Sequence, residues 1–423
     1  MRLANREALV RGFLAIMLCL LIGFALSEDR ARIAWRTVLG GMGLQALLAL
    51  LLIRLPGARV LLGPLDAAAA ALQRASDAGS GFVFGYLGGG VLPFDEKFPG
   101  GAYILAFRAL PLVVIISAAS AVLFHWGVLQ RVMGAFAWLL RRVLGIDGAL
   151  ALGAASHVLL GQVESPLLIR PYLAGMQRGE LFALMSCGMA GVAGTVMVIY
   201  AGFLAHVVPD ALGTILVASV LSTPAALAIA AMMVPFGAGD GAAGELVIED
   251  APASTLDAFV KGTLDGVPVV AAIVAVLICT IAAVSAINMV LGLLPLVDGV
   301  PVTLQMLAAW VFRPLVWLMG VPWEQSGVAA GLMGTKTVLN EFVAYLDLAR
   351  LPPGSLSPVA SVIMAYALCG FANFGSLGIM LGGIGAMVPR RRAELARLGL
   401  RTILSGTLAS CCSGAWAGLL SVT

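Results

Sequence analysis

The sequence predicts an all-α polytopic membrane protein with about eight transmembrane helices, two re-entrant hairpins and interfacial helices. Of its 423 residues, 61% are hydrophobic and only 11% are charged, and the mean hydropathy is +1.03. No soluble domain could bury that much apolar surface. Apolar runs of about 20 residues, the length that a ~30 Å hydrocarbon core requires, recur along the chain. Several segments also occur twice, which predicts an inverted repeat.

The repeat is visible as three matches in the same order. The segment LQRVMGAFAWLL, from Leu129, resembles LQMLAAWVFRPL, from Leu304. Each is followed by a Gly- and Ala-rich stretch that ends in a polar tip. Beyond the tips, CGMAG at 187–191 matches CGFAN at 369–373. One match between apolar helices is weak evidence, but three in one order indicate an internal duplication, a plan that transporters often use to form a midplane site from broken helices.

The two tips place carboxylates and amides inside apolar sequence. The first tip is GQVESP at 161–166, and the second is GTKTVLNEFVAY at 334–345. An ionised group at bilayer depth is costly, so it usually faces a protein-lined or watery cavity. Loop tips at the membrane surface are the alternative interpretation for either one. Two tips at matching positions favour a functional site.

The hydropathy pattern assigns each element of the repeat. The predicted spans are 8–26, 35–53, 101–124, 181–208, 211–235, 267–294, 357–388 and 401–422. Segment 61–75 predicts an interfacial helix, and the Gly-rich segment 82–94 a close-packed loop. The amphipathic segments 127–145 and 302–321 predict helices along the membrane surface. The predicted hairpins are 146–172 and 322–348, because their arms are too short to cross.

Charge and cysteine content narrow the compartment and the partners. The net charge of +3 is small and scattered, so nucleic acid is not an expected partner. The six cysteines lie in apolar runs without metal-ligand spacing, which predicts packing roles. Arginines between 390 and 401 predict that the loop between the last two spans is cytoplasmic. We therefore expect a multi-pass protein of the cell inner membrane, surrounded by lipid.

The polar groups near the tips suit a neutral solute that is rich in hydroxyls and amides. Amides donate and accept hydrogen bonds, ionised carboxylates only accept, and hydroxyls do either; the residues are Gln162, Asn373, Glu164, Glu341, Ser165 and Ser376. The sequence lacks the cluster of cations that a phosphate or carboxylate substrate would need. Phe371 adds an apolar wall for a flat ring.

Two other classes of protein are remote alternatives. An intramembrane enzyme needs a nucleophile with a base or a metal set, but HExxH, GxSxG and paired aspartates are absent from the sequence. A channel is also conceivable, although opposing hairpins suit alternating access better than an open pore. We therefore expect a transporter and not an enzyme.

Three motifs resemble the concentrative nucleoside transporters. They are GxKxxxNEFVAY at 334–345, GQxESPLLIRPYL at 161–173 and GFANFGS at 370–376. The resemblance extends from about residue 82 to about residue 389. It implies a homotrimer whose protomers each have a scaffold and a moving transport domain. It also implies import of nucleosides by cation symport, through an elevator-type movement.

The resemblance divides the chain into four parts. Residues 1–126 hold the N-terminal spans, the interfacial helix and the third span, and we expect them in the scaffold with the loop and span of 236–301. Residues 127–235 and 302–423 each hold a surface helix, a hairpin, a broken span and a following span. These two repeats are expected to form mainly the transport domain.

Carried over by position, the resemblance also implies the substrate-binding residues. Gln162 and Glu164 would contact the nucleobase, with Val163 and Val196 beside it. The ribose hydroxyls would be held by Glu341, Asn373 and Ser376, and Phe371 would line the pocket. Position 163 is often threonine in the family. Valine removes a hydroxyl that could reach the base, so the preference for purine or pyrimidine stays open.

The sodium site of the family is altered here. Members with that site use an Asn five residues before the hairpin glutamine and a Ser three residues before the glycine that aligns with Gly194. This chain has His157 and Gly191 at those positions. Only the backbone carbonyls of Leu160 and Val192 remain, whereas a hard cation needs several oxygen ligands.

We therefore predict proton coupling, with sodium coupling as the alternative and with no resident cofactor or metal. Glu341 is the favoured proton carrier, because a carboxyl group in a low-dielectric pocket can take up and release a proton. His157 is the other candidate, since imidazole titrates near neutral pH. Alternatively, His157 fills the vacated cation space and hydrogen-bonds hairpin backbone.

Overall fold

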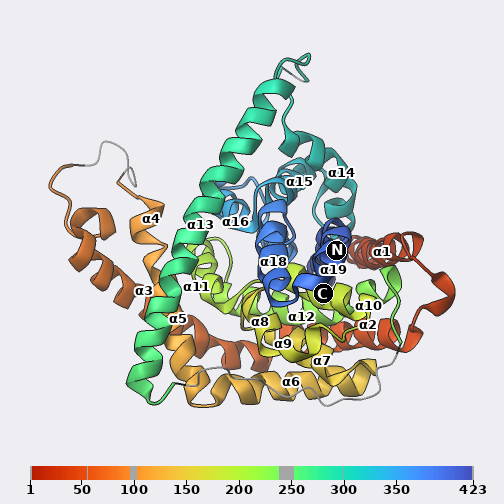
Figure 1. The fold of residues 1–423 in the computed structure, drawn as a ribbon. Coiled ribbons are helices and arrows are strands. Elements are labelled where there is room, and N and C mark those ends of the chain that lie inside the picture. The colour runs from red at the N-terminus through yellow and green to blue at the C-terminus, as the bar shows by residue number, and fades with distance from the viewer. Residues whose placement is uncertain (1, 55, 96–101, 238–251, 298, 422–423) are drawn as a thin grey trace.

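The computed structural model describes residues 2–54, 56–95, 102–237, 252–297 and 299–421. Within them the chain is helical, with one isolated β-bridge between Val297 and Val300. Figure 1 shows the long helix α13 (Thr255–Leu291) running along one side of a body of packed helices, with α6 (Val128–Leu144) beneath it. The predicted all-helical, multi-pass architecture is thus present.

Among the described residues, six helices are long and apolar enough to cross a membrane. They are Trp35–Arg54, Leu105–His125, Arg178–Leu204, Ala211–Met233, Thr255–Leu291 and Pro389–Ser421. The predicted spans 8–26 and 357–388 contain only shorter apolar helices, Leu9–Ala25, Pro358–Leu368 and Phe374–Met387. The count of eight spans therefore stays a prediction.

The N-terminal part contains α1 (Arg2–Ala25), α2 (Trp35–Ala49), α3 (Pro56–Phe84), α4 (Leu105–Arg108) and α5 (Pro111–His125). Helices α1 and α2 pack against α12 (Ala211–Met233) and α19 (Arg392–Ser421), whereas α5 packs along α13. The division of the chain into scaffold and transport domain stays a prediction.

Helix α3 is longer than the predicted interfacial helix. It takes up residues 82–84, which we expected in a loop. The run of alanines in α3 favours helix, and the helix ends where Gly85 adopts a positive φ of 61°.

The two repeats contain the same order of elements. The first consists of α6, α7 (Gly148–Ser156), α8 (Glu164–Leu168), α9 (Arg170–Leu173), α10 (Arg178–Ala190), α11 (Gly194–Leu204) and α12. The second consists of α14 (Leu304–Leu318), α15 (Trp323–Val338), α16 (Glu341–Arg350), α17 (Pro358–Leu368), α18 (Phe374–Met387) and α19. We call α7–α9 hairpin 1 and α15–α16 hairpin 2. Each repeat therefore has a surface helix, a hairpin, a broken helix and a long helix.

The breaks in the helices have local causes. Helix α10 ends at Gly191, whose extended backbone leads into α11. Between α17 and α18, Gly370 has a φ of 144°, and a Cβ there would lie 2.8 Å from the Met189 carbonyl oxygen. Only glycine allows this conformation and this close approach.

Two predicted boundaries are wrong. Helix α13 begins at Thr255, well before the predicted start at 267, because Ser254 caps it by accepting a hydrogen bond from Asp257 N. Helix α19 begins at Arg392, so most of the basic residues predicted in a loop lie on its first turns. A different predicted loop, which begins at residue 236 and precedes α13, has an acidic part at 238–251 that lies outside the described residues.

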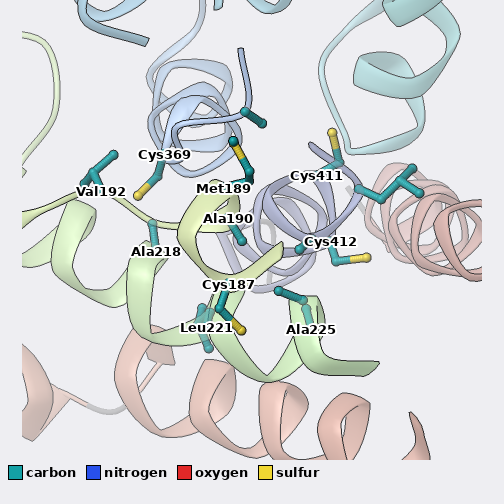
Figure 2. Packing of buried hydrophobic residues seen from close by; sticks show 14 of the residues in the cluster. Cys187, Met189, Ala190, Val192, Ala218, Leu221, Ala225, Cys369, Cys411 and Cys412 are labelled. Atoms are coloured by element: carbon teal, nitrogen blue, oxygen red, sulfur yellow. The ribbon is translucent and has the colours of Figure 1, made fainter. Parts of the chain in front are cut away.

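The core lies among α10, α12 and α19, and Figure 2 shows small side chains where these helices meet. Cys187, Cys369, Cys411 and Cys412 are buried there, and Cys19 is buried on α1. These five cysteines pack as predicted. Cys279 differs because it is exposed on α13, a helix that buries few of its side chains.

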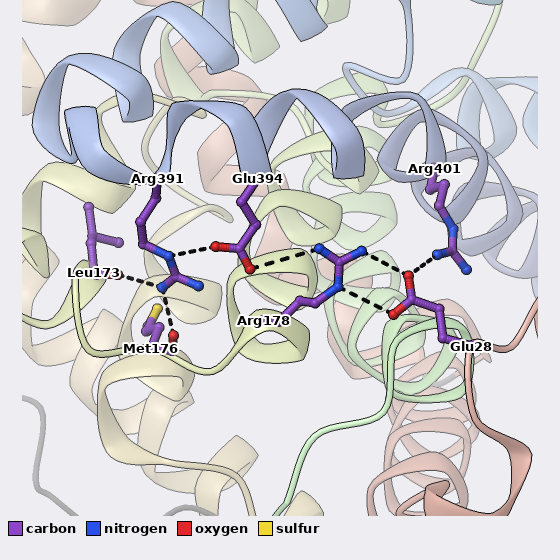
Figure 3. A network of polar contacts seen from close by, with 7 residues as sticks. All are labelled: Glu28, Leu173, Met176, Arg178, Arg391, Glu394 and Arg401. Atoms are coloured by element: carbon purple, nitrogen blue, oxygen red, sulfur yellow. Dashed lines mark hydrogen bonds and ion pairs between the residues drawn. The ribbon is translucent and has the colours of Figure 1, made fainter.

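Charged residues form a network of polar contacts, which Figure 3 shows from close by. Glu28 pairs with Arg178 at 2.9 Å and also with Arg401, and Arg391 pairs with Glu394 at 2.9 Å. The network joins the segment after α1 to α10 and α19. The arginines predicted in a cytoplasmic loop thus take part in this network, while the side of the membrane that they face stays a prediction.

Candidate functional site

A cavity of about 320 Å³ lies where the two hairpins and the two broken helices meet. All the residues predicted to contact the substrate line it: Gln162, Val163, Glu164, Val196, Glu341, Phe371, Asn373 and Ser376. Apolar residues of α13, from Pro268 to Leu277, form a further wall. Glu164 and Glu341, far apart in the sequence, therefore face one shared hollow.

Glu341 is the most firmly held polar group of the cavity. Its side chain is buried at the first residue of α16, where the partial positive charge of a helix N-terminus favours a carboxylate. The Tyr200 hydroxyl donates to Oε1 at 2.8 Å, and Asn373 Nδ2 donates to Oε2 at 2.9 Å. Asn340 caps the same helix by accepting from Val343 N at 2.9 Å. The carboxyl group is thus fixed in position with one edge toward the cavity.

Asn373 joins hairpin 2 to the broken helix α18. Its Oδ1 caps α18 by accepting from Ser376 N at 2.8 Å, while its Nδ2 donates to Glu341. On the other side, Gln162 Nε2 donates to the Ser376 carbonyl at 3.1 Å. The start of α18 therefore forms hydrogen bonds with polar side chains of both hairpins.

Hairpin 2 also binds the carbonyl end of α17. The last carbonyls of a helix have no partner within it. Here the Tyr345 hydroxyl donates to Ala365 O at 2.8 Å, and Lys336 Nζ donates to Ala367 O at 2.8 Å and to Ser410 Oγ at 2.9 Å. Lys336 is fully buried in this role. These bonds attach both arms of hairpin 2 to the broken helix beside the cavity.

Hairpin 1 has a looser tip. Residues 157–163 separate α7 from α8, and three buried polar atoms near the tip have no partner among the described residues: Gln162 Oε1, His157 Nε2 and Ser165 Oγ. Glu164 is exposed toward the cavity and has no hydrogen bond or ion pair within the described part of the chain. Gln162 and Glu164 line the cavity, so the tip of hairpin 1 offers unused acceptors to a ligand.

The altered cation positions lie together behind this tip. The His157 ring is 3.1 Å from the Cβ position of Gly188, and the His157 carbonyl is 3.9 Å from that of Gly191. Val192 N binds Ser219 Oγ at 3.3 Å, and Gly194 N binds Leu159 O at 3.1 Å.

The histidine thus packs between hairpin 1 and α10. Among the described residues no group of three or more His, Cys, Asp or Glu side chains could hold a metal ion. The roles of His157, Leu160, Gly191 and Val192 in coupling stay a hypothesis.

Sequence reasoning missed several residues of the cavity. Tyr200, Thr195 and the wall from α13 also line it. Tyr200 lies six residues after the Gly194 break, and the need of a buried carboxylate for donors is the signal that points to it. The wall from α13 has no polar motif, so only the packing reveals it.

Two hairpins and two broken helices around one polar cavity are typical of helical membrane transporters that are built from repeats. Family models agree with this class. Residues 14–87 and 214–418 match the N-terminal and C-terminal parts of the "Na+ dependent nucleoside transporter" family, and residues 106–207 match "Nucleoside recognition".

Individual proteins agree with the family models. An uncharacterized transporter of Haemophilus influenzae is 34% identical over 97% of this chain and 98% of its own length. Sodium/nucleoside cotransporter 1 of mouse is 35% identical over 99% of this chain, which spans 65% of the length of the mouse protein. Solved structures of CNTnw match as well: an inward-facing, substrate-bound state has a TM-score of 0.87 with 34% identity, each chain being 98% covered.

A doubly substituted CNTnw in an outward-facing state has a TM-score of 0.88 with 34% identity, covering 100% of this chain and 98% of the other. The chain belongs to the concentrative nucleoside transporter family, which is a family of transporters and not of enzymes.

Proposed function

We propose that the protein imports nucleosides across the cell inner membrane by proton symport, with alternating access of the elevator type. The observation that carries this proposal is the shared cavity, because Glu341 and Glu164 face it from opposite hairpins. The ribose hydroxyls would bind Glu341, Asn373 and Ser376, and the base would bind Gln162 and Glu164 beside Val163 and Val196.

The chemistry of the cavity supports a neutral, partly flat solute. Its polar groups are amides, carboxyls and hydroxyls, whereas no lysine or arginine lines it among the described residues. Phe371 and the apolar residues of α13 offer surface to a ring. A volume of about 320 Å³ lies at the lower end of the range of small-molecule sites.

Proton coupling is supported by the residues at the altered cation positions. An imidazole and a glycine replace two side-chain oxygens, and a hard cation needs several oxygen ligands. Glu341 has the hydrogen-bond partners and the access to the cavity that a proton carrier needs. The mouse and other mammalian relatives are named sodium/nucleoside cotransporters, so the cation is the point to test.

The test is uptake of labelled uridine into proteoliposomes under imposed gradients. We expect uridine accumulation that requires an inward proton gradient, is abolished by a protonophore and does not depend on sodium. Uptake that sodium stimulates would refute proton coupling and leave the family assignment intact. Saturable uptake that no gradient drives uphill would favour a channel or a uniporter.

A paired substitution sharpens this test. His157→Asn combined with Gly191→Ser restores both side-chain oxygens, and serine fits at position 191 because the nearest atom to its Cβ is Ser219 Oγ at 3.5 Å. We expect the double variant to gain sodium-stimulated uptake. The control, His125→Asn with Gly134→Ser, makes the same changes away from the cavity, at a glycine with open space around it, and should stay insensitive to sodium.

We also propose a homotrimer, which the resemblance implies. Helix α13 supports an interface between copies of the chain, since large apolar side chains such as Leu264, Ile278 and Met289 are each about two-thirds exposed on it. Light scattering of the purified protein should give a trimer mass, and a monomer at all protein concentrations would contradict this proposal.

A further inference from the structure

A second cavity, of about 750 Å³, lies between α3 and α4 on one side and α11 and α16 on the other. Its volume falls within the range of sites that bind drug-sized molecules. The polar residues that line it are Gln73, Asp77, Tyr103, Arg108, His206 and Arg350. It shares no lining residue with the first cavity.

An aromatic cluster separates the two cavities. Phe203 lines the second cavity and packs edge-on against Phe342 at 5.5 Å, and Phe342 packs against Tyr200 at 5.8 Å. Phe342 and Tyr200 in turn line the first cavity. The second cavity is therefore a separate site and not an extension of the first.

The charge of the second cavity is positive and unbalanced. The lining contains one carboxylate, Asp77, beside Arg108 and Arg350, and it already accepts a hydrogen bond from Gln73 Nε2 at 2.9 Å. The charge of Arg350 also acts on Asp347, which does not line the cavity. Neither arginine forms an ion pair within the described part of the chain. Arg108 Nε is buried without a partner there, and a buried donor that is left unpaired is costly.

The charged groups converge on one phenol. Burial raises the pKa of the Tyr103 hydroxyl, whereas the charges of Arg108 and Arg350 lower it and that of Asp77 raises it. Arg108 also lies over the Tyr103 ring, 5.9 Å from its centroid. Both guanidinium groups belong to the lining of one cavity, although they come from different elements, α4 and α16.

We propose that this second cavity binds a phosphate group carried on a larger molecule, held between Arg108 and Arg350. The planar guanidinium fork matches phosphate oxygens, and such charge-assisted bonds are about twice as strong as neutral ones. The Tyr103 hydroxyl is a further donor on the same wall. The cavity is much larger than one phosphate, so the rest of the ligand occupies the space along α3 and α11.

Two sources can supply such a group: the headgroup of an anionic phospholipid, or a soluble phosphomonoester such as a nucleoside 5′-monophosphate. The proposal concerns a different cavity and a different charge from the nucleoside site. It therefore stands or falls independently of the proposed transport function.

The experiment measures both sources on the purified full chain. Calorimetry with uridine 5′-monophosphate, in the presence of excess uridine to occupy the first cavity, tests the soluble source. Native mass spectrometry with added phosphatidylglycerol tests the lipid source. The variant is Arg108→Gln with Arg350→Gln. The control is Arg74→Gln, an exposed arginine of α3 that does not line the cavity.

We expect saturable binding in one arm, weakened at least about tenfold in the double glutamine variant and unchanged in the control. The arm that responds identifies the source. Absence of saturable binding in both arms, or equal binding by all variants, would overturn the proposal. If the glutamine pair does not fold, Arg108→Lys with Arg350→Lys replaces it, and full affinity in that variant would contradict recognition by guanidinium forks.

Discussion

Hairpin 1 and hairpin 2 occupy equivalent places in the repeat, yet they hold their carboxyl groups in different ways. Glu341 of hairpin 2 is only 4% exposed and accepts hydrogen bonds from Tyr200 and Asn373. Glu164 of hairpin 1 is exposed to the cavity, and buried polar atoms around it have no partner among the described residues.

The difference extends to the length and the attachment of the tips. Two residues separate α15 from α16, whereas seven separate α7 from α8. Hairpin 2 is bonded to α17 through Lys336 and Tyr345. Hairpin 2 is therefore organised before a ligand arrives, while hairpin 1 has unused acceptors, on Gln162 and Glu164, in the wall of the cavity. This contrast predicts that hairpin 2 fixes the common part of nucleosides and hairpin 1 reads the part that varies.

The largest effect should follow from removing the charge of Glu341. Glu341→Gln removes the proposed proton carrier and would weaken the proposed bonds to the ribose, so we expect accumulation of uridine to be abolished. Binding should weaken at least about tenfold, as expected for hydrogen bonds to a charged group. Uptake and equilibrium binding measure both effects.

Glu164→Gln is the matched substitution in hairpin 1. It should leave uridine accumulation within about threefold of native and change the ratio of uridine to adenosine uptake, because an amide replaces an acceptor at the base. Equal losses in both variants would contradict the division of roles between the hairpins.

A smaller effect should follow from loosening hairpin 2. Tyr345→Phe leaves the buried Ala365 carbonyl without its 2.8 Å partner. We expect a loss of about 1–3 kcal/mol in stability, the cost of one unsatisfied buried group. Thermal unfolding in detergent measures this loss. The control is Tyr86→Phe, at an exposed residue of the segment after α3, and it should be neutral.

The smallest effect concerns the charged network, which lies far from both tips. The hydrogen bond from Arg178, with the charges of Arg178 and Arg401, lowers the pKa of Glu28 from its ordinary value of 4.5. A carboxyl whose pKa is lower in the folded state stabilises that state when it is ionised, and this stabilisation is lost as the pH falls through the folded pKa.

Glu28→Gln should therefore lower the free energy of unfolding at pH 7 by at most about 1 kcal/mol, because these groups are partly exposed. The melting temperature measures this loss. The gap between variant and native protein should close as the pH falls below 4.5. A gap that is independent of pH would contradict the role of this ion pair.

The sequence predicts the site better than it predicts the boundaries of the helices. Polar tips in apolar surroundings and their repetition indicate which residues meet, because a buried carboxylate needs partners. The extra turns of α3, α13 and α19 could not be predicted in this way, since hydropathy marks where a helix enters lipid and not where it begins. Tyr200 was missed because its role depends on a contact with a residue 141 positions away.

The comparison of the hairpins is tested most directly by the binding of uridine and 2′,3′-dideoxyuridine to the native protein and to the two glutamine variants. We predict that uridine binds the native protein about 10- to 100-fold more tightly, the range for hydrogen bonds to a charged group. This ratio should fall toward one in Glu341→Gln and persist in Glu164→Gln. A ratio that Glu341→Gln leaves unchanged would contradict the assignment of the ribose to hairpin 2.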